Sequence, residues 1–101
     1  MAKLIWSERA ISDLENIYDY IAADSPRYAQ YTIQNIFQST ERLETFPDSG
    51  RHLPEFPNIP HRELILANYR IIYRYDDNEL AIKIITVIHG SRLLKEGFLK
   101  E

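Results

Sequence analysis

The sequence of 101 residues contains no cysteine, which excludes disulfide bonds, thiol catalysis and thiolate metal sites. Three glycines and five prolines are too few for a linker-like or collagen-like chain. No apolar run approaches the roughly 18 residues that a transmembrane helix needs. Acidic Glu8 comes too early for a secretory signal. We therefore expect a mature cytoplasmic protein without a membrane segment.

The composition is typical of a folded protein, with 45% hydrophobic and 27% charged residues. This length predicts one domain over residues 1–101. The net charge of −3 is uneven. The first half has eight acids and four bases, and the second half has seven acids and eight bases. This mild basic bias is far from the strongly basic composition of a typical nucleic-acid binder.

Two amphipathic helices are expected in the first half. Ser7 is a candidate N-cap, and apolar residues from position 11 to position 21 follow helical spacing, so we expect a helix over residues 8–23. Ser25 caps a second helix, and Pro26 suits its first turn because proline has no N–H to leave unpaired there. That helix is expected over residues 26–46. The short connection makes the two helices fold back as a hairpin.

The rest of the chain predicts a loop and a sheet. Residues 47–61 contain four prolines, which predicts a stiff loop of about 15 residues, long enough to have a functional role. The β-branched and aromatic runs predict strands over residues 3–6, 62–66, 69–75 and 80–89. The turn at Asp76-Asp77-Asn78 leaves the register of the last two strands undecided.

These elements predict a two-layer α+β fold in the order β-α-α-β-β-β. A helical hairpin with one apolar stripe needs one face of a small antiparallel sheet to cover it. The strand over residues 3–6 should join that sheet at its edge. Residues 92–101 are a polar tail with a few apolar docking points. We expect the sheet face opposite the helices to stay uncovered and to grip other macromolecules.

Basic residues gather on one predicted face of the sheet. Alternation puts Arg70 and Arg74 on the face opposite the tyrosines of their own strand. A two-residue hairpin loop puts Lys83 and His89 on the face of Arg70 and Arg74, and a three-residue loop moves them away. The candidate target- or anion-binding residues are Arg62, Arg70, Arg74, Lys83 and Arg92. They either bind an anionic partner or pair locally with Asp and Glu side chains.

The motifs of common catalytic and metal sites are missing. The three histidines, His52, His61 and His89, are isolated and lack a paired spacing such as H-x-x-x-H. There is no G-x-S-x-G motif and no phosphate-binding glycine-rich loop. Glu41 and Glu44 lie one turn apart, but acids on an exposed helix face usually point to solvent. We expect no metal site and no cofactor.

Four segments, taken in order, resemble the ParE/RelE toxin superfamily. Residues 6–21 contain S-x-x-A-x-x-D-L-x-x-I-x-x-Y-I at the start of the first helix, and residues 43–51 contain P-x-x-G-R. Residues 69–74 are similar to the family's central strand, and residues 87–92 to its terminal strand. The matches span about residues 4–92, and the family's order of elements is the one predicted above.

The resemblance implies the toxin of a type II toxin–antitoxin pair, bound by a cognate antitoxin protein. RelE-like members cleave mRNA in the ribosomal A site, whereas ParE-like members inhibit DNA gyrase by binding it. For a metal-independent endoribonuclease, the resemblance gives Arg70, His89 and Arg92 as candidate catalytic residues. The two arginines would bind phosphate, and His89 would act as acid or base.

The match to the RelE-like nucleases is incomplete. Phe98 lies near the position of their tyrosine and cannot transfer a proton. Their paired loop lysines have no clear equivalents, and Arg51 and His52 are the nearest residues. The ending over residues 89–92 is more similar to ParE. We expect a gyrase inhibitor without enzyme activity, with a ribosome-dependent mRNA endoribonuclease as the alternative and a repurposed partner-binding protein as a third reading.

Overall fold

A computed structural model describes residues 1–101. Its elements, in chain order, are β1 (Lys3–Trp6), α1 (Glu8–Ala22), α2 (Pro26–Glu41), the 3₁₀ turn η1 (Arg42–Glu44), β2 (Arg51–His52), β3 (Arg62–Leu66), β4 (Tyr69–Asp76), β5 (Ala81–His89) and the 3₁₀ turn η2 (Glu96–Leu99). The second helix ends earlier than predicted and tightens into η1. Neither α-helix combines the length and apolar content needed to cross a membrane.

Helix α1 begins at a cap that also fastens it to the sheet. The Ser7 hydroxyl accepts a hydrogen bond from the Ala10 N–H at 3.0 Å and donates one to the Ile85 carbonyl oxygen at 2.7 Å. Ala10 and Leu14 are buried, whereas Ile11 is 41% exposed. The apolar stripe is therefore rotated slightly from the predicted one, because the cap fixes which side of the first turn meets β5.

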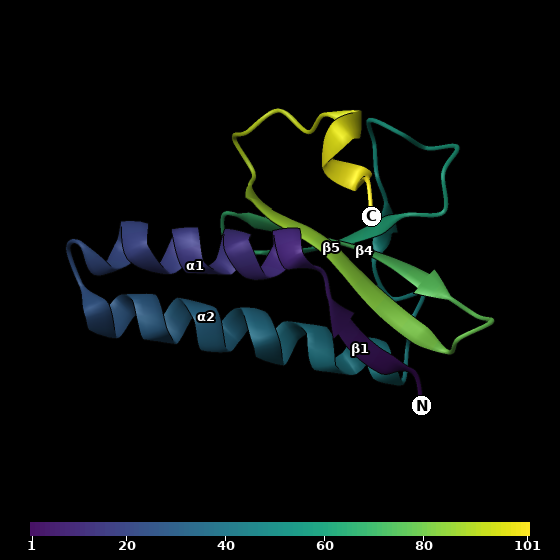
Figure 1. Ribbon diagram of the computed structural model, residues 1–101, viewed down its shortest axis with the longest axis horizontal. Coiled ribbons are helices and arrows are strands. Elements are labelled where there is room, and N and C mark those ends of the chain that lie inside the picture. The colour runs from purple at the N-terminus through teal and green to yellow at the C-terminus, as the bar shows by residue number, and fades with distance from the viewer.

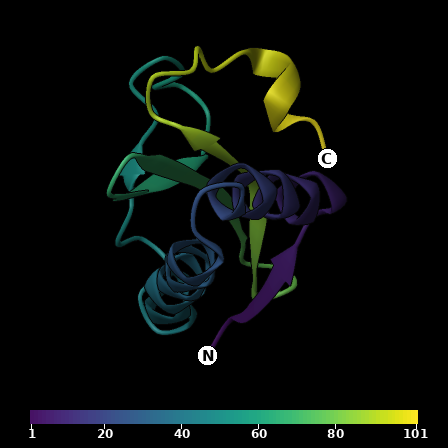
Figure 2. The same cartoon turned by 90° about the vertical axis from the view of Figure 1, so that its left-hand side faces the viewer.

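The two helices lie side by side and run antiparallel, as Figure 1 shows along their length and Figure 2 nearly end-on. Ser25 caps α2 by accepting a hydrogen bond from the Tyr28 N–H at 3.1 Å, and Pro26 occupies the first turn. Ala29 and Ile36 are buried along the inner side of α2. The predicted helical hairpin is confirmed, and its inner side supplies the apolar stripe that meets the sheet.

The sheet has five strands in the order β1-β5-β4-β3-β2. Strands β3, β4 and β5 form the predicted antiparallel meander, and β1 joins at the edge as predicted. Strand β1 runs parallel to β5, so the sheet is mixed rather than purely antiparallel. The short strand β2 lies within the segment predicted as a loop and pairs with β3.

A β-bulge near the middle of the sheet decides which side chains share a face. Strand β4 ends at Asp76 and β5 begins at Ala81, so residues 77–80 form the connecting loop. Before the bulge, Arg74 lies opposite Lys83, as predicted. The register then shifts between Ile72 and Tyr73, and beyond the shift His89 lies opposite Tyr69.

Neither predicted register is correct for both residues: Lys83 shares the face of Arg74, but His89 does not share the face of Arg70. A bulge inserts one extra residue into one strand and reverses the alternation beyond it. Asp13 of α1 reaches β5 at this bulge. Its carboxylate accepts hydrogen bonds from the Val87 N–H at 3.0 Å and from the Thr86 hydroxyl. The aspartate of the helix motif thus stabilises the bulge, which has backbone groups outside the regular ladder.

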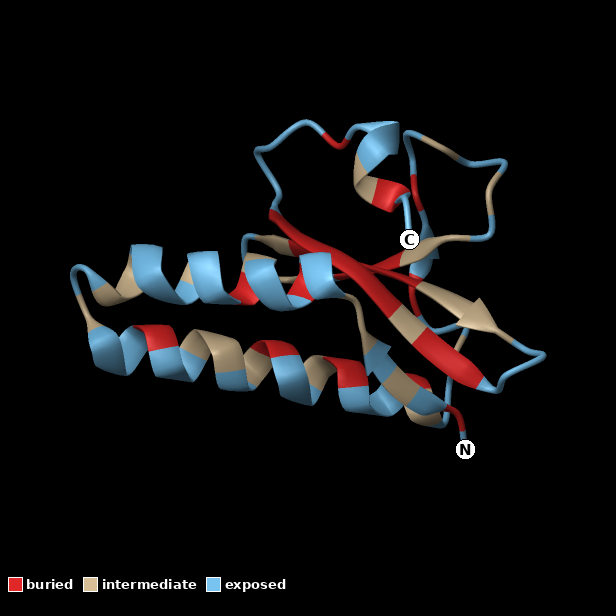
Figure 3. Cartoon of the chain, in the orientation of Figure 1, coloured by how far each residue is buried: buried red, intermediate tan, exposed pale blue.

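The two faces of the sheet carry separate apolar clusters. The helix-face core contains eleven buried residues: Ala2, Ala10, Leu14, Ile36, Leu43, Leu64, Ile71, Tyr73, Ile82, Ile84 and Val87. The opposite-face cluster contains six: Leu53, Ile72, Ile85, Ile88, Leu94 and Leu99. In Figure 3, strand β5 is buried along most of its length, and β4 is buried in its first half and intermediate toward its end. The expectation that the face opposite the helices stays uncovered is therefore wrong, because Leu53 and the segment around η2 cover part of that face.

The P-x-x-G-R segment is fixed to the sheet through Tyr73. The Gly50 N–H donates to the Tyr73 hydroxyl oxygen at 2.9 Å, and that hydroxyl donates to the Pro47 carbonyl oxygen at 2.7 Å. A Cβ on Gly50 would lie 2.6 Å from the Glu63 carbonyl oxygen and 2.7 Å from the Tyr73 ring. Only glycine allows this close approach. The motif therefore sets the path by which the following residues reach β2.

Candidate functional site

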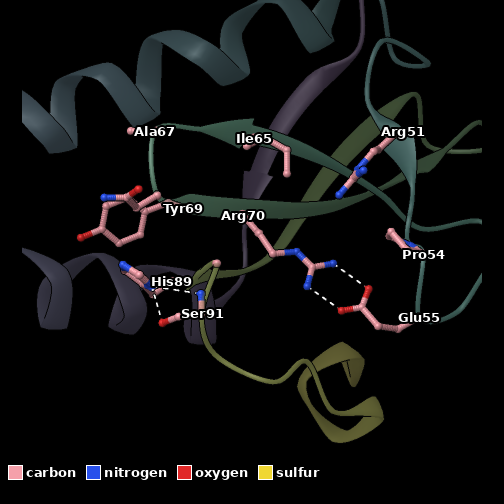
Figure 4. A pocket seen from close by; sticks show the side chains of 11 residues that line it. Arg51, Pro54, Glu55, Ile65, Ala67, Tyr69, Arg70, His89 and Ser91 are labelled. Atoms are coloured by element: carbon pink, nitrogen blue, oxygen red, sulfur yellow. Dashed lines mark hydrogen bonds and ion pairs between the residues drawn. The ribbon is translucent and has the colours of Figure 1, made fainter.

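A shallow, open groove of about 400 Å³ lies where β3, β4 and the end of β5 meet the segment after β2. Figure 4 shows its lining side chains. Arg51, Glu55 and Arg70 lie at one end, and His89 and Ser91 at the other. We call this the Arg70 groove. It brings together two of the three candidate nuclease residues, Arg70 and His89, although they project from different strands.

Arg70 is the most tightly held cation of the groove. It is 8% exposed and lies on β4. Its Nε donates to Glu63 Oε1 at 2.6 Å. Its Nη1 and Nη2 donate to the two carboxylate oxygens of Glu55 at 2.6 and 2.8 Å. Carboxylates thus occupy both the Nε and the two terminal nitrogens of the guanidinium group. The pair with Glu55 has the bidentate geometry that makes such pairs strong.

Glu63 links Arg70 to a second arginine. Its side chain is fully buried, and its other oxygen accepts from Arg51 Nε at 2.7 Å. Together, Arg51, Glu63, Arg70 and Glu55 form what we call the Arg–Glu network. Two positive and two negative charges balance in it, which fits the rule that buried charges are paired and hydrogen-bonded.

The titration of the network follows from these contacts. The hydrogen bond to Glu55 raises the pKa of Arg70 far above its usual range, and burial only partly opposes this. The hydrogen bond from Arg70 lowers the pKa of Glu55. Both groups are therefore charged at neutral pH. Any external anion must displace Glu55 before it can bind the guanidinium fork.

Arg74 and Lys83 are also paired with acids. Arg74 donates from Nε and Nη2 to the Glu101 carboxylate at 2.7 and 2.8 Å. This contact raises the pKa of Arg74 and lowers the pKa of Glu101. The Lys83 Nζ lies 3.6 Å from an oxygen of Asp76 and 3.5 Å from one of Glu79. Of the alternatives for these two residues, the structure shows local pairing.

Arg62 contacts the chain segment that leads into β2. Its Nη1 donates to the Gly50 carbonyl oxygen at 2.8 Å, and its Nε lies 3.7 Å from an oxygen of Asp48. Because both contacts are to the segment before β2, Arg62 stabilises the path of that segment. It does not line the Arg70 groove.

Arg92 differs from the other predicted anion-binding residues because it forms no ion pair. Its guanidinium carbon lies 4.7 Å from the centre of the Phe98 ring, and that of Arg9 lies 5.2 Å from the same ring. Both arginines are exposed. Arg9 also sits in the first turn of α1, where the helix dipole disfavours a cation. Phe98 therefore holds both arginines through cation–π contacts, and no carboxylate neutralises their charges.

His89 ends β5 and is exposed. Its ring meets the edge of Tyr69 with centroids 5.6 Å apart, and its Nδ1 accepts from the Ser91 N–H at 3.1 Å. The Ser91 hydroxyl lies 2.7 Å from the same nitrogen. In Figure 4 the Arg70 side chain extends toward Glu55 and away from His89. The groove therefore presents to a ligand one histidine and two arginines, Arg51 and Arg70, that are paired with glutamates.

Arg92 and His89 meet at a neighbouring cavity between α1 and the end of β5. Arg92 does not line the Arg70 groove, so the three candidate nuclease residues are not gathered around one cavity. No three His, Asp or Glu side chains of the chain are arranged to hold a metal ion.

Sequence reasoning missed Glu55, Glu63 and Arg9. Glu63 interrupts a short apolar strand, a pattern that signals a buried partner for a nearby cation. Glu55 stands in a proline-rich loop, and nothing in the pattern links it to Arg70, fifteen residues away. Arg9 stands beside other charged residues at the start of a helix, and nothing in the pattern distinguishes it from them.

Comparison with known proteins gives concordant relatives. Residues 4–94 match the family described as ParE toxin of type II toxin-antitoxin system, parDE. Toxin RelE2 of Caulobacter vibrioides is 31% identical over 93 residues, covering 92% of this chain and 100% of that protein. Putative toxin Y4kP of Sinorhizobium fredii is 33% identical over 92 residues, covering 87% and 88%.

Solved structures give the same result for the fold. The chromosomal ParDE TA system from P. aeruginosa matches with a TM-score of 0.71 and 26% identity, covering 88% of this chain and 96% of that chain. The isolated E. coli RelE toxin matches with a TM-score of 0.64, covering 97% and 92%, and its 15% identity supports the fold alone. The chain belongs to the ParE/RelE superfamily of type II toxin–antitoxin toxins, as its motifs predict.

Proposed function

We propose that this toxin acts in the cytoplasm by binding DNA gyrase in the manner of ParE, and that a cognate antitoxin neutralises it. The observation that carries this proposal is the state of Arg70. Metal-free RNA cleavage needs free cations for the phosphate and two groups that exchange protons. Here the guanidinium fork of Arg70 is filled by Glu55, and Phe98, which cannot transfer a proton, lies near the position of the tyrosine of RelE-like nucleases.

A protein partner also fits the exposed aromatic surface of the helices. Tyr20 is 83% exposed, and Tyr28 and Tyr31 are stacked with centroids 6.2 Å apart while more than half exposed. Large aromatic side chains left in water are typical of interaction sites. The structural relatives include the ParDE system of P. aeruginosa and the intact E. coli RelBE toxin–antitoxin complex. We assign the tyrosines of the hairpin to antitoxin binding.

The direct test compares the two targets. The purified toxin is added to a gyrase supercoiling and DNA-cleavage assay and, separately, to translating ribosomes with a reporter mRNA. We expect loss of supercoiling with trapped DNA breaks, and intact mRNA. Cuts at codon positions in the mRNA without any effect on gyrase would overturn the proposal. No effect in either assay, together with no growth arrest on expression, would overturn the proposal and indicate a repurposed partner-binding protein.

Arg92 provides the matched variant. It is the predicted target-binding residue that has no carboxylate partner, so its charge is available to the target. We expect Arg92→Ala to weaken gyrase inhibition by about tenfold, as for a cation at an interface. Lys95→Ala, which removes the same charge from a nearby exposed position, should have a much smaller effect.

A second candidate, a ribosome-dependent mRNA endoribonuclease, is favoured by one observation. His89 lines the same groove as Arg70 and is exposed at its open end. If the ribosome assay gives cuts, His89→Ala should abolish them, whereas a gyrase inhibitor should tolerate this substitution. Persistent cutting by His89→Ala would contradict the role of His89 as acid or base.

A further inference from the structure

We propose that Glu55 is a specificity-determining residue, which occupies the guanidinium fork of Arg70 and thereby prevents the groove from binding RNA phosphates. This inference deepens the proposed function, because it names the contact that separates a protein-binding toxin from an RNA-binding one. Its test needs neither gyrase nor ribosomes.

The geometry of the contact resembles that of a bound phosphate. Arg70 Nη1 and Nη2 donate in parallel to the two oxygens of Glu55 at 2.6 and 2.8 Å. An arginine fork binds carboxylate and phosphate with the same pair of N–H groups. A phosphate and Glu55 therefore compete for one position and cannot occupy it together.

The two acids of the network play different parts. Glu63 is fully buried, belongs to β3 and bridges Arg70 to Arg51, so it holds the arginine within the fold. Glu55 lies on the loop between β2 and β3, lines the groove, and has a third of its side chain exposed. Removing Glu55 would open the fork onto the groove while Nε stays bound to Glu63.

The charge balance of the network also indicates that the groove would bind an anion without Glu55. The network holds two arginines and two glutamates, and it becomes a site of charge +1 when one carboxylate is removed. The freed N–H groups would then lack a partner at the wall of a groove of about 400 Å³. A guanidinium fork that faces an open groove without a carboxylate partner is free to bind an anion from solution.

In the wild-type protein the loop also holds Glu55 in position, so that Glu55 excludes an external phosphate from the fork. Leu53, two residues earlier, is fully buried in the opposite-face cluster, and its carbonyl oxygen accepts from the Phe56 N–H at 3.2 Å. The loop is thus anchored on both sides of Glu55. A tethered group has an effective concentration on the order of millimolar or above, which exceeds that of free RNA.

The experiment measures binding of a short fluorescein-labelled single-stranded RNA by fluorescence anisotropy at low salt. The proteins are the wild type, Glu55→Ala and the control Glu79→Ala. Glu79 is paired with Lys83, so the control makes the same change in net charge and also removes a carboxylate from a cation. We expect Glu55→Ala to bind the RNA about tenfold more tightly than both other proteins.

Two further measurements test whether the fork itself binds the RNA. Single-strand binding weakens with salt in proportion to the number of phosphates contacted, so the log–log salt dependence of Glu55→Ala should be steeper by about 0.7 for one added contact. Adding Arg70→Lys, which keeps the charge for Glu63 but loses the fork, should cancel most of the gain.

Equal RNA affinity of Glu55→Ala and Glu79→Ala would overturn the inference, and so would a gain that survives Arg70→Lys. If Glu55→Ala fails to fold, the near-isosteric Glu55→Gln takes its place under the same criteria. RNA binding and gyrase inhibition are measured in separate assays, so failure of the proposed function leaves the RNA result interpretable, and the reverse also holds.

Discussion

The two faces of the sheet are held by different kinds of contact. All eleven buried residues of the helix-face core are apolar or aromatic. The opposite face has a smaller apolar cluster of six residues beside the Arg–Glu network, whose Glu63 and Arg70 are buried charges. The helix face therefore relies on non-directional burial, and the opposite face relies on charges whose positions must match.

This difference separates stability from specificity. Apolar burial stabilises in proportion to area and tolerates substitutions that conserve volume. A buried ion pair contributes little net stability, because desolvation offsets the attraction, but it fixes geometry. The helix-face core thus explains why the ParE/RelE fold forms, whereas the opposite face holds the Arg–Glu network, to which we assign a role in target choice.

The largest expected effect breaks the helix face. Leu43 of η1 is fully buried in that core, and Leu43→Ala should lower the free energy of unfolding by about 4 kcal/mol through lost burial and a cavity. Leu99→Ala, at the rim of the opposite-face cluster, should cost about 2 kcal/mol because η2 can relax into the space. Urea unfolding measures both. Equal losses would remove the distinction between the faces.

A smaller effect is expected from breaking the Arg–Glu network. Glu63→Gln removes the carboxylate between Arg51 and Arg70 and should cost about 3 kcal/mol, since it leaves poorly compensated buried charge. Glu15→Gln, on the exposed side of α1, is the control and should change stability by less than about 0.5 kcal/mol. If urea unfolding gives a loss for Glu63→Gln near that of the control, the network does not hold the opposite face.

The smallest expected effect concerns pH. Burial lowers the pKa of His61, and neither of its ring nitrogens has a hydrogen-bond partner. Because the pKa is lower in the folded state, stability is complete above the unfolded value of about 6.5 and falls as pH drops below it. The charged groups near the ring, Glu101 and Arg74, partly oppose each other, and Glu96 and Lys100 line the cavity beside it.

His61→Leu should remove this loss. Thermal unfolding between about pH 7.5 and about pH 5.5 should show a flatter profile for the variant, by less than about 1 kcal/mol. Below about pH 4.5 both proteins should lose stability, since the pKa values of Glu55 and Glu101 are lowered in the folded state and protonation breaks their pairs with arginine. Parallel profiles over the upper range would show that His61 does not titrate as expected.

Local patterns in the sequence predicted most of the framework. The caps at Ser7 and Ser25 and the helical spacing between them predicted the hairpin of α1 and α2. The β-branched runs gave three strands of the meander almost to the residue. Signals of this kind lie within a few residues of one another and depend on the intrinsic geometry of helices and strands.

The arrangement of the site required the folded chain. The bulge beside Tyr73 moved His89 off the face of Arg70, and a single inserted residue leaves no mark in an alternating pattern. The partner of Arg70 depended on the path of a loop anchored through Gly50 and Leu53. Periodicity specifies which residues turn inward, but contacts between distant segments are set by how the backbone is packed, and in this toxin those contacts determine whether its central arginine is free.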